Sequence, residues 1–355
     1  MRVLRVYPFL PPLPGGMEKH IQRLTQEQRL LGCEVTVAFN RGFETAPGDL
    51  HVLQAINLRR IKPQPLRDLI FYVAVLIRII FGGIHADIIH IHGDWSAFLF
   101  GRVLGWAAGA NAMAASVHGV VRKGRWAWVY KQVLSGYTLV YCTGAGDANY
   151  LQQAGVDVVR WQNSGIDPEF FLEKTAAQDK VMPVTDIACV ANFFPVKNLA
   201  LVIDIARAMP DVTFLLIGDG PLRFELETRC RNETLKNVRL TGMLTAQKVS
   251  QQLRVSRIFL STSFSEGTPT ALLEAMACGL PVITSNSNDY RNLITAGRNG
   301  YVIDNFDVKN YVTLLRELLA DNLLLADIAI HNKTEAKRHA WPEVAKRITN
   351  WMRAA

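Results

Sequence analysis

Residues 258–284 have the sequence IFLSTSFSEGTPTALLEAMACGLPVIT, which contains a complete strand–loop–helix–strand unit. The apolar run Ile258–Leu260 predicts a buried strand, Thr270–Ala277 predicts a helix, and Pro281–Thr284 predicts a second strand. A polar loop with Glu266 connects the first strand to the helix. Because two parallel strands need a crossover between them, this unit predicts a parallel sheet with helices on its faces.

The same alternation of short apolar runs and helix-length amphipathic stretches extends along the chain in two series. The first series has strands at Val3–Tyr7, Val35–Phe39, Asp87–Ile91, Met113–Val117 and Thr138–Cys142, with helices at Met17–Leu31 and Trp126–Leu134. The second has strands at Ile187–Val190, Val212–Ile217, Val238–Leu240, Ile258–Leu260 and Pro281–Thr284, with helices at Leu199–Met209, Leu222–Arg231, Ala246–Leu253 and Thr270–Ala277. Beyond Asp307 the pattern is helical.

Two such series predict an α/β protein with two Rossmann-like, doubly wound domains that face a central cleft. We place the first domain at residues 1–165 and the second at 185–339. Residues 166–184 have the proline and charge content of a linker, and a last helix covers 340–355. In such folds the ligand binds at the carboxyl ends of the strands.

Composition excludes several classes of protein. The 355 residues are 49% apolar and 20% charged, which excludes disordered and low-complexity chains. The five cysteines are scattered without metal-binding spacing and are expected to be buried thiols of a reducing cytoplasm. The apolar run Leu69–Ile84 contains Arg78 and is too short to span a membrane, so a buried helix is favoured over an interfacial one.

The net charge of +8 suits an anionic partner, and it leans toward the first half of the chain. Residues 1–180 contain 19 Lys and Arg against 14 Asp and Glu, and the remainder contains 20 against 17. Basic clusters lie at Arg59–Lys62 and Arg122–Arg125. They are either solvated surface or a docking site for anionic lipid or an acceptor diphosphate. Nucleic acid is disfavoured because the charges are spread over both halves.

Several loops that follow predicted strands have residues suited to phosphate or sugar chemistry. Gly15-Gly16 and Gly218-Asp219-Gly220 leave the backbone open before a helix, where N–H groups attract anions. Lys197 follows another strand and can neutralise phosphate. Glu266 and Glu274, eight positions apart, suit hydroxyl recognition or acid–base work. Taken singly, a turn is the favoured explanation of each glycine motif, and a surface or structural role is the alternative for the lysine and the two glutamates.

Three histidines, His90, His92 and His118, lie at the ends of predicted strands of the first domain. His90 and His92 share one face of a strand, but no third ligand of suitable spacing accompanies them, so no metal site is predicted. His118 follows the strand Met113–Val117 and is expected at the edge of the cleft.

Together, these motifs resemble those of retaining nucleotide-sugar glycosyltransferases of GT-B fold, the group 1 transferases of bacterial envelope polysaccharides. The resemblance covers nearly the whole chain, and its most specific part is the E-x7-E segment from Glu266 to Glu274. The supporting motifs occur in the family's order: Gly15-Gly16, His118-Gly119, Asn163–Asp167, Lys197-Asn198, Gly218–Pro221 and Asn299-Gly300. The C-terminal helix resembles the family segment that crosses back onto the first domain.

The resemblance implies a role for each matching residue. Glu274 would hold the donor ribose, Glu266 the transferred sugar, and Lys197 the diphosphate, while His118 would contact the sugar near the reacting centre. His118, Glu266 and Lys197 are the implied catalytic residues. Donor binding is assigned to Gly16, Asn192, Lys197, Gly218, Asp219, Gly220, Glu266, Gly267, Thr268, Pro269, Thr270 and Glu274, and acceptor binding to Gly15, His92, Arg122 and Lys123.

The family's favoured route is front-face displacement, in which the leaving phosphate takes the acceptor proton; a covalent carboxylate intermediate is the alternative. Front-face displacement needs no metal, and no cofactor is expected besides the nucleotide sugar as substrate. One residue departs from the family pattern: Asn192 stands where members usually have an arginine, five positions before the lysine.

The leading hypothesis is therefore a retaining hexosyltransferase that uses a UDP- or GDP-sugar. Its acceptor would be a saccharide or lipid-linked saccharide in lipopolysaccharide, capsule or exopolysaccharide synthesis, and the protein would be cytoplasmic and peripheral at the inner face of the cell membrane. The alternative is a non-catalytic glycosyltransferase-like subunit that binds a partner or a glycan, as Asn192 suggests. A dinucleotide-dependent oxidoreductase is disfavoured because no G-x-G-x-x-G follows the first strand.

Overall fold

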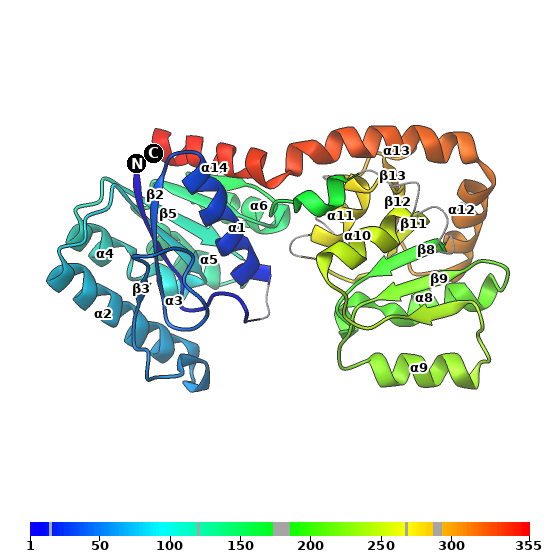
Figure 1. Ribbon diagram of the computed structural model, residues 1–355, viewed down its shortest axis with the longest axis horizontal. Coiled ribbons are helices and arrows are strands. Elements are labelled where there is room, and N and C mark those ends of the chain that lie inside the picture. Colours follow the sequence, from blue (N-terminus) through cyan, green and yellow to red (C-terminus); the bar gives the residue numbers. More distant parts are fainter. Residues whose placement is uncertain (14–15, 119–120, 173–184, 267–268, 287–292) are drawn as a thin grey trace. The chain divides into compact units, whose positions relative to one another are not determined.

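The structure, a computed structural model, describes all residues except 14–15, 119–120, 173–184, 267–268 and 287–292. Its internal contacts divide the chain into two units (Figure 1). Unit 1 comprises Met1–Gly165 together with Trp341–Ala355, and unit 2 comprises Ile166–Ala340. The donor-loop residues Gly267 and Thr268, and Gly15 of the proposed acceptor site, lie outside the described residues.

Unit 1 is built on a seven-stranded parallel sheet. Its strands are β1 (Arg2–Val6), β2 (Glu34–Phe39), β3 (Leu50–His51), β4 (Ile88–Gly93), β5 (Ala112–Val117), β6 (Leu139–Cys142) and β7 (Val159–Trp161). They lie in the order β3-β2-β1-β4-β5-β6-β7, and the register places Val3 beside Val35 on one side and beside Ile88 on the other. The chain therefore adds strands first to one side of β1 and then to the other.

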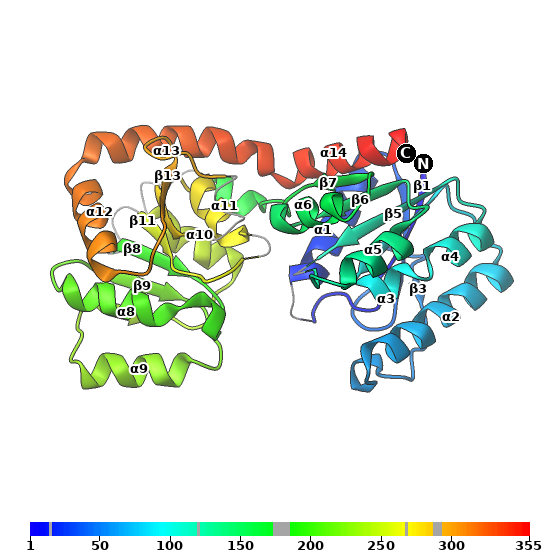
Figure 2. The ribbon, with the colours of Figure 1, turned by 180° about the vertical axis from the view of Figure 1, so that it is seen from behind.

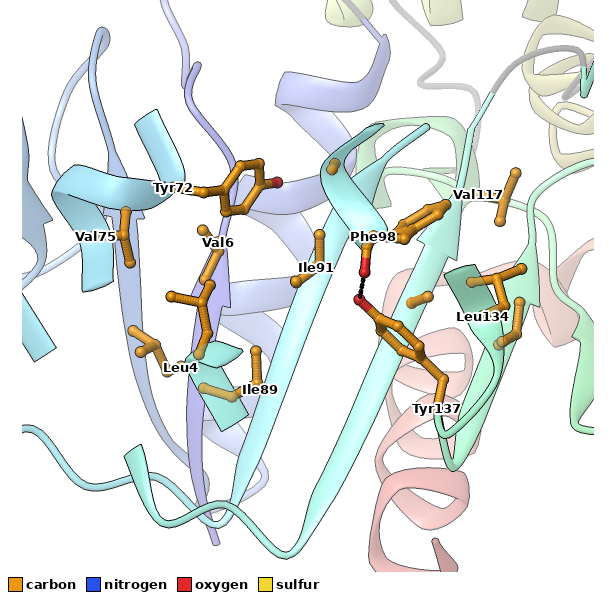
Figure 3. Packing of buried hydrophobic residues seen from close by; sticks show 14 of the residues in the cluster. Leu4, Val6, Tyr72, Val75, Ile89, Ile91, Phe98, Val117, Leu134 and Tyr137 are labelled. Carbon is orange, nitrogen blue, oxygen red and sulfur yellow. Dashed lines mark hydrogen bonds between the residues drawn. The ribbon is translucent and has the colours of Figure 1, made fainter. Parts of the chain in front are cut away.

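Helices cover both faces of this sheet because successive strand residues point to opposite sides. They are α1 (Gly16–Leu30), α2 (Gln64–Gly82), α3 (Trp95–Phe98), α4 (Gly101–Ala108), α5 (Trp126–Leu134), α6 (Ala145–Gln153) and α14 (Trp341–Ala354), with a 3-10 turn η1 (Leu58–Arg60). Leu4, Val6, Ile89 and Ile91 pack against α2 to α6 (Figure 3). The Tyr137 hydroxyl donates to the Phe98 carbonyl at 2.7 Å within this layer.

Helix α14 covers the other face of the sheet beside α1 (Figures 1 and 2). Trp341, Val344, Ile348 and Met352 are buried against strand residues such as Tyr141. The ring of Trp341 lies so close to Gly165 that an added Cβ there would come within 2.4 Å of it. The last segment of the chain thus completes the core of the first unit, which confirms the predicted crossing of the C-terminal helix.

Unit 2 is built on a six-stranded parallel sheet. Its strands are β8 (Thr185–Val190), β9 (Phe214–Ile217), β10 (Val238–Leu240), β11 (Ser256–Ser261), β12 (Val282–Ser285) and β13 (Gly300–Ile303), in the order β10-β9-β8-β11-β12-β13. The helices are α8 (Leu199–Ala208), α9 (Arg223–Asn232), α10 (Ala246–Arg254), α11 (Thr270–Ala277), α12 (Val308–Ala320) and α13 (Asn322–Ala336), with 3-10 turns η2 (Pro168–Phe171), η3 (Pro195–Lys197) and η4 (Lys337–His339).

Two apolar layers hold unit 2 together, one on each face of its sheet. Ile187, Cys189 and Leu216 point toward α8, α9 and α12, whereas Ala188 and Leu215 point toward α10, α11 and η2. This alternation along β8 and β9 is the period of two that a doubly covered parallel strand requires. The predicted GT-B architecture of two doubly wound α/β units is confirmed.

One sequence interpretation is wrong. The run Leu69–Ile84 was expected to form a buried helix rather than an interfacial one, but α2 exposes Leu69, Val73, Ile77 and Ile80 while it buries Phe71, Val75 and Ile79. Among the described helices none has the length and hydropathy needed to cross a membrane. All five cysteines are buried free thiols, as predicted.

Candidate functional site

The strand order of unit 2 marks a ligand site at the carboxyl end of β8. After β8 the chain continues to β9 on one side, and β11 pairs on the other side, so the loops that follow β8 and β11 diverge. In open α/β sheets the crevice at such a reversal binds the ligand. Lys197 follows β8 and Glu266 follows β11, so the topology alone brings together two of the three implied catalytic residues.

Lys197 and Glu266 form a tight ion pair at this crevice. The Lys197 ammonium lies 2.7 Å from each carboxylate oxygen of Glu266, and the Ser263 hydroxyl donates to Oε1 at 2.6 Å. The side chains are 22% and 10% exposed, respectively. A cation and a carboxylate so shielded from water exert stronger fields on a bound ligand than surface charges do.

Backbone contacts between the two loops fix the position of this pair. Lys197 ends the 3-10 turn η3, and Asn198 then adopts a left-handed conformation with φ of 47° before α8 begins. The Thr262 hydroxyl donates to the carbonyls of Lys197 and Asn198, at 3.2 and 3.0 Å. The N–H of Phe264 donates to the Val196 carbonyl at 2.9 Å. The loop of the lysine and the loop of the glutamate are therefore one hydrogen-bonded assembly.

The glycines after β9 are required by packing. Gly218 and Gly220 have φ of 138° and 156°, and a Cβ at Gly218 would lie 1.8 Å from the Ala191 carbonyl oxygen. Asp219 accepts hydrogen bonds from the N–H of Gly220 and from Arg223. The close approach of Gly218 to Ala191 packs the Gly218–Gly220 loop against the loop that contains Asn192. The side chain of Asn192 itself is exposed. The structure thus places the two predicted donor loops side by side.

Helix α11 provides the remaining predicted donor residues. Pro269 is buried at its N-cap position, and Thr270 is its first residue. Glu274 lies just over one turn farther on and is half-buried. The first N–H groups of a helix lack partners within it and favour an anion.

Unit 1 has its own strand-order reversal, between β1 and β4, and a cavity lies there. Its volume is about 280 Å³. Tyr7 and Pro8 after β1, His92 and Asp94 at the end of β4, and His118 after β5 contribute to its wall. The two histidines predicted to contact sugar or acceptor therefore share one cavity at the carboxyl edge of the sheet.

The wall of the cavity contains polar groups that the sequence patterns did not reveal. Asp68 on α2 accepts from Ser96 at 2.6 Å and from Arg67 at 3.2 Å, and Asp94 accepts from the hydroxyl of Tyr130. The Tyr72 hydroxyl is buried and has no hydrogen-bond partner among the described residues, and the same holds for Nε2 of His92. Carboxylates and a guanidinium thus line the cavity, and two residues of its wall, Tyr72 and His92, each contain a buried unsatisfied polar atom.

A third histidine, His20 on α1, joins His92 and His118. Nδ1 of His92 lies 3.1 Å from Nε2 of His118, and Nδ1 of His20 lies 2.8 Å from the Ser164 hydroxyl. In the part of the chain that is described, ring nitrogens of these three residues lie within 4.8 Å of one another, as metal ligands would. The sequence spacing gave no sign of His20 because it comes from a different element. The short contacts of His92 with His118 and of His20 with Ser164 are equally consistent with a hydrogen-bonded network.

Burial keeps these imidazole rings neutral. Desolvation lowers the pKa of His20, of His92 and of His118, and the nearby Arg5 guanidinium lowers the pKa of the first two further. A neutral imidazole donates a hydrogen bond through one nitrogen and accepts one through the other, which suits contact with sugar hydroxyls.

Three predicted residues of unit 1 have no part in the cavity wall. Arg122 and Lys123 are exposed, and the Arg122 guanidinium stacks over the Trp126 ring at 4.9 Å. Gly16 begins α1, and an added Cβ there would meet no described atom within 4 Å. Packing therefore does not require a glycine at this helix start, in contrast to Gly218 and Gly220.

Two family models match the chain, one over each unit. The model described as Glycosyltransferase Family 4 matches residues 14–170, and the model described as Glycosyl transferases group 1 matches residues 173–336. The second match includes Lys197, Glu266 and Glu274.

Curated relatives are identical to the chain at about a quarter of the aligned positions. It is 27% identical to the sulfoquinovosyl transferase of Arabidopsis thaliana over 54% of the chain and 39% of that protein. It is 24% identical to the UDP-Gal:alpha-D-GlcNAc-diphosphoundecaprenol alpha-1,3-galactosyltransferase of Escherichia coli over 67% of each. It is 28% identical to the GDP-mannose-dependent monoacylated phosphatidylinositol monomannoside mannosyltransferase of Corynebacterium glutamicum over 56% of the chain and 54% of that protein. The matches with the first and third of these thus span less than two thirds of the relatives' lengths.

Solved structures share the fold across the full chain. The structure of Anabaena HepE in complex with UDP superposes with a TM-score of 0.81 at 17% identity and covers 100% of both chains. The lipopolysaccharide outer core galactosyltransferase WaaB superposes with a TM-score of 0.73 at 17% identity, over 100% of this chain and 99% of that one. Fold, motif order and family matches agree, and the chain belongs to the group 1 glycosyltransferases of GT-B fold.

Proposed function

We propose that the protein transfers a sugar from a UDP- or GDP-sugar to a saccharide or lipid-linked saccharide during the synthesis of a bacterial envelope polysaccharide. The observation that carries this proposal is the Lys197–Glu266 ion pair at the β8/β11 reversal. Both residues lie in the part of the chain that the group 1 model matches, and Glu266 begins the E-x7-E segment. The names of the relatives support it, because the Escherichia coli protein is a galactosyltransferase that uses UDP-Gal and the Corynebacterium glutamicum protein is a GDP-mannose-dependent mannosyltransferase.

Each donor group then has a partner of matching chemistry in unit 2. The Lys197 ammonium neutralises a diphosphate oxygen, and the N–H groups at the start of α11 bind a second one. The Glu266 carboxylate accepts hydrogen bonds from hydroxyls of the transferred sugar, and Glu274 accepts them from the ribose. Asn192 and the Gly218–Gly220 loop border the same crevice.

Catalysis follows from stabilising the charge that moves to the leaving group. As the bond from the anomeric carbon to the phosphate oxygen lengthens, the sugar gains oxocarbenium character and the diphosphate gains negative charge. A fixed ammonium and helix N–H groups interact more strongly with that charge than with the ground state, which lowers the barrier. Glu266 holds Lys197 in place before the donor arrives. We propose that the reaction retains the anomeric configuration and needs no metal.

The cavity of unit 1 is proposed to take the acceptor. A volume of about 280 Å³ lies just below the ~300–1,000 Å³ typical of ligand pockets, which suits a terminal sugar rather than a long chain. Asp68 and Asp94 can accept hydrogen bonds from sugar hydroxyls, while Tyr72 and His92 supply the unsatisfied polar atoms. His118 is proposed to contact the transferred sugar from this edge of the sheet.

One observation favours a second candidate, a non-catalytic glycosyltransferase-like binding subunit. Asn192 provides no cation at the position where the family usually has an arginine. Arg223, a cation of the neighbouring loop, is already paired with Asp219 at 2.9 Å and with Glu227 at 2.8 Å. Lys197 would then neutralise the charge of the diphosphate without a contribution from position 192 or from Arg223.

A panel of UDP- and GDP-sugars tests the proposal by the nucleotide that the protein releases, first with water and then with saccharide acceptors. Turnover with at least one donor is expected. Lys197→Met and Glu274→Gln should each lower turnover by about 10²-fold, the usual effect of removing one group that stabilises transition-state charge. The exposed lysine Lys248 provides the control, because Lys248→Met should leave turnover unchanged.

If Lys197→Met and Glu274→Gln both turned over normally, the site assignment would be wrong. Calorimetry that shows no affinity for any nucleoside diphosphate would favour the binding subunit. The proton NMR coupling at the anomeric carbon of the product tests retention, and unchanged turnover in a chelator tests metal independence.

A further inference from the structure

Helix α2 presents a continuous apolar stripe to solvent. Its exposed large side chains recur every three or four positions along one side of the helix: Leu66, Leu69, Val73, Ile77, Ile80 and Phe81. Phe81 is 86% exposed. The opposite side of α2 is the part that packs on the sheet, through Phe71, Tyr72, Val75 and Ile79. A helix that is apolar on both sides within a folded unit has one side available to another apolar phase.

The neighbouring helices extend this stripe into a surface. Helix α4 lies beside α2 in both views of the ribbon and contacts it (Figures 1 and 2). It exposes Val103 and Trp106, the latter at 83%, and Leu99 precedes it with 52% exposed. We call these nine side chains the α2–α4 face. Contiguous apolar surface on this scale usually marks a site of association.

The charge of the surrounding chain identifies the partner. From His51 to Cys142 the sequence has ten Lys and Arg but three Asp and Glu, so this segment accounts for seven of the eight net positive charges. The three acids are engaged locally: Asp68 is buried, Asp94 caps α3, and Asp87 pairs with Arg2 at 2.8 Å. The exposed charges of this segment, which contains both helices of the apolar surface, are therefore basic. They include Arg60, Lys62, Arg78 and Arg102.

We propose that the α2–α4 face docks on an anionic lipid bilayer. Apolar side chains with an interfacial tryptophan and flanking basic residues are the chemistry that binds such a surface, since the rings enter the headgroup region and the Arg side chains reach the lipid phosphates. A second copy of the chain fits less well, because pairing this face with itself would bring like charges together.

This docking extends the proposed function, and its role in the reaction rests on that function. The first turns of α2 contribute Gln64, Arg67 and Asp68 to the wall of the cavity in unit 1. The same helix thus borders the proposed acceptor cavity and carries the apolar stripe. A lipid-linked acceptor could keep its chains in the bilayer while its sugar enters the cavity.

Sedimentation of the full-length protein with vesicles tests the docking. We expect binding to vesicles of phosphatidylcholine with phosphatidylglycerol, weaker binding to phosphatidylcholine alone, and a decrease with added salt. The double variant Phe81→Ser/Trp106→Ser should bind the anionic vesicles at least about tenfold more weakly, because two large apolar contacts are lost. Arg78→Glu/Arg102→Glu should have an effect of similar size.

A matched control removes equally exposed apolar side chains from unit 2. Phe224 and Leu323 are 75% and 85% exposed, and Phe224→Ser/Leu323→Ser should bind vesicles like the unchanged protein. An equal loss of vesicle binding in Phe81→Ser/Trp106→Ser and in the control Phe224→Ser/Leu323→Ser would overturn the proposal. So would unchanged binding in both of these variants. So would a dimer in solution that becomes a monomer in Phe81→Ser/Trp106→Ser without any vesicle binding by the unchanged protein.

The failure of docking and the failure of the proposed function are separable. The docking variants should keep the nucleotide release seen with a water-soluble acceptor, because none of their residues lies in the donor or acceptor sites. Vesicle binding without any nucleotide affinity would reject the proposed function and leave the docking intact.

Discussion

His20, His90, His92 and His118 lie close together between the unit 1 sheet and α1. Nε2 of His90 lies 2.6 Å from the Ser116 hydroxyl, and Nδ1 of His92 lies 3.1 Å from Nε2 of His118. Burial lowers the pKa of each of the four rings. The folded protein therefore holds them neutral at pH values where the unfolded chain would protonate them.

The stability of the protein should consequently fall in mild acid. The contribution of the neutral rings is fully present above the unfolded pKa near ~6.5 and is lost as the pH falls toward the folded values, by up to about 1.4 kcal/mol per pH unit for each ring. Urea denaturation at a series of pH values between neutral and about 5 measures this slope. His92→Gln should reduce it, whereas His85→Gln, which changes an exposed ring, should not. A free energy of unfolding that is constant over this range would contradict the prediction.

At the residue scale, sequence motifs predicted the part of the candidate site that adjoins the ends of consecutive strands. Lys197 and Glu266 lie in loops that the strand pattern placed at one edge of the sheet, so their contact was foreseeable. Asp68 was not, because it belongs to the interior of a helical pattern and reaches the cavity through the packing of α2. The same is true of His20, whose approach to His92 depends on how α1 lies across the sheet.

At the scale of elements, the position of α14 depends on the absence of a side chain at Gly165. A methyl group there would lie 2.4 Å from the Trp341 ring and 2.8 Å from its Cα, so the helix start would have to move. Gly165→Ala should therefore lower the melting temperature by several degrees, since overpacking usually costs ~1–3 kcal/mol. Gly16→Ala is the matched control, because no described atom lies within 4 Å of its added Cβ. Equal melting temperatures for the two variants would mean that α14 tolerates displacement.

Long periodic segments were predicted well, whereas of the four edge strands of the described sheets only β10 was predicted, as Val238–Leu240. Trp126–Leu134 and Thr270–Ala277 were predicted with the bounds of α5 and α11, since their apolar spacing is helical throughout. The patterns missed β3, β7 and β13, which have two to four residues and pair at or next to the edges of their sheets. A strand of that length buries too few side chains to leave a period of two. The exposed side of α2 was missed because hydropathy does not tell which apolar side faces the sheet.

At the scale of the whole molecule, unit 1 depends on the last residues of the chain. Trp341, Val344, Ile348 and Met352 are each at most 2% exposed against the unit 1 sheet and α1. Four such side chains contribute roughly 1.5–3 kcal/mol each by burial. Their sum is comparable with the ~5–15 kcal/mol that stabilises a typical domain.

A chain that ends at Ala340 should therefore not maintain unit 1. We expect it to aggregate or to bind an apolar dye, whereas a chain shortened by the two exposed residues Ala354 and Ala355 should behave like the full-length protein. Gel filtration and dye fluorescence distinguish the two. A soluble, monomeric 1–340 chain that keeps the near-ultraviolet circular dichroism of the full protein would contradict this dependence.

The return of α14 to unit 1 also sets an order for folding during synthesis. A ribosome releases residues 1–165 first, but these lack the helix that covers Leu24 and Tyr141. The whole of unit 2 is then made before Trp341 emerges. Unit 2 can finish its core while still attached to the ribosome, whereas the part of the unit 1 sheet that α14 covers stays exposed in the nascent chain until residues 341–355 have been made.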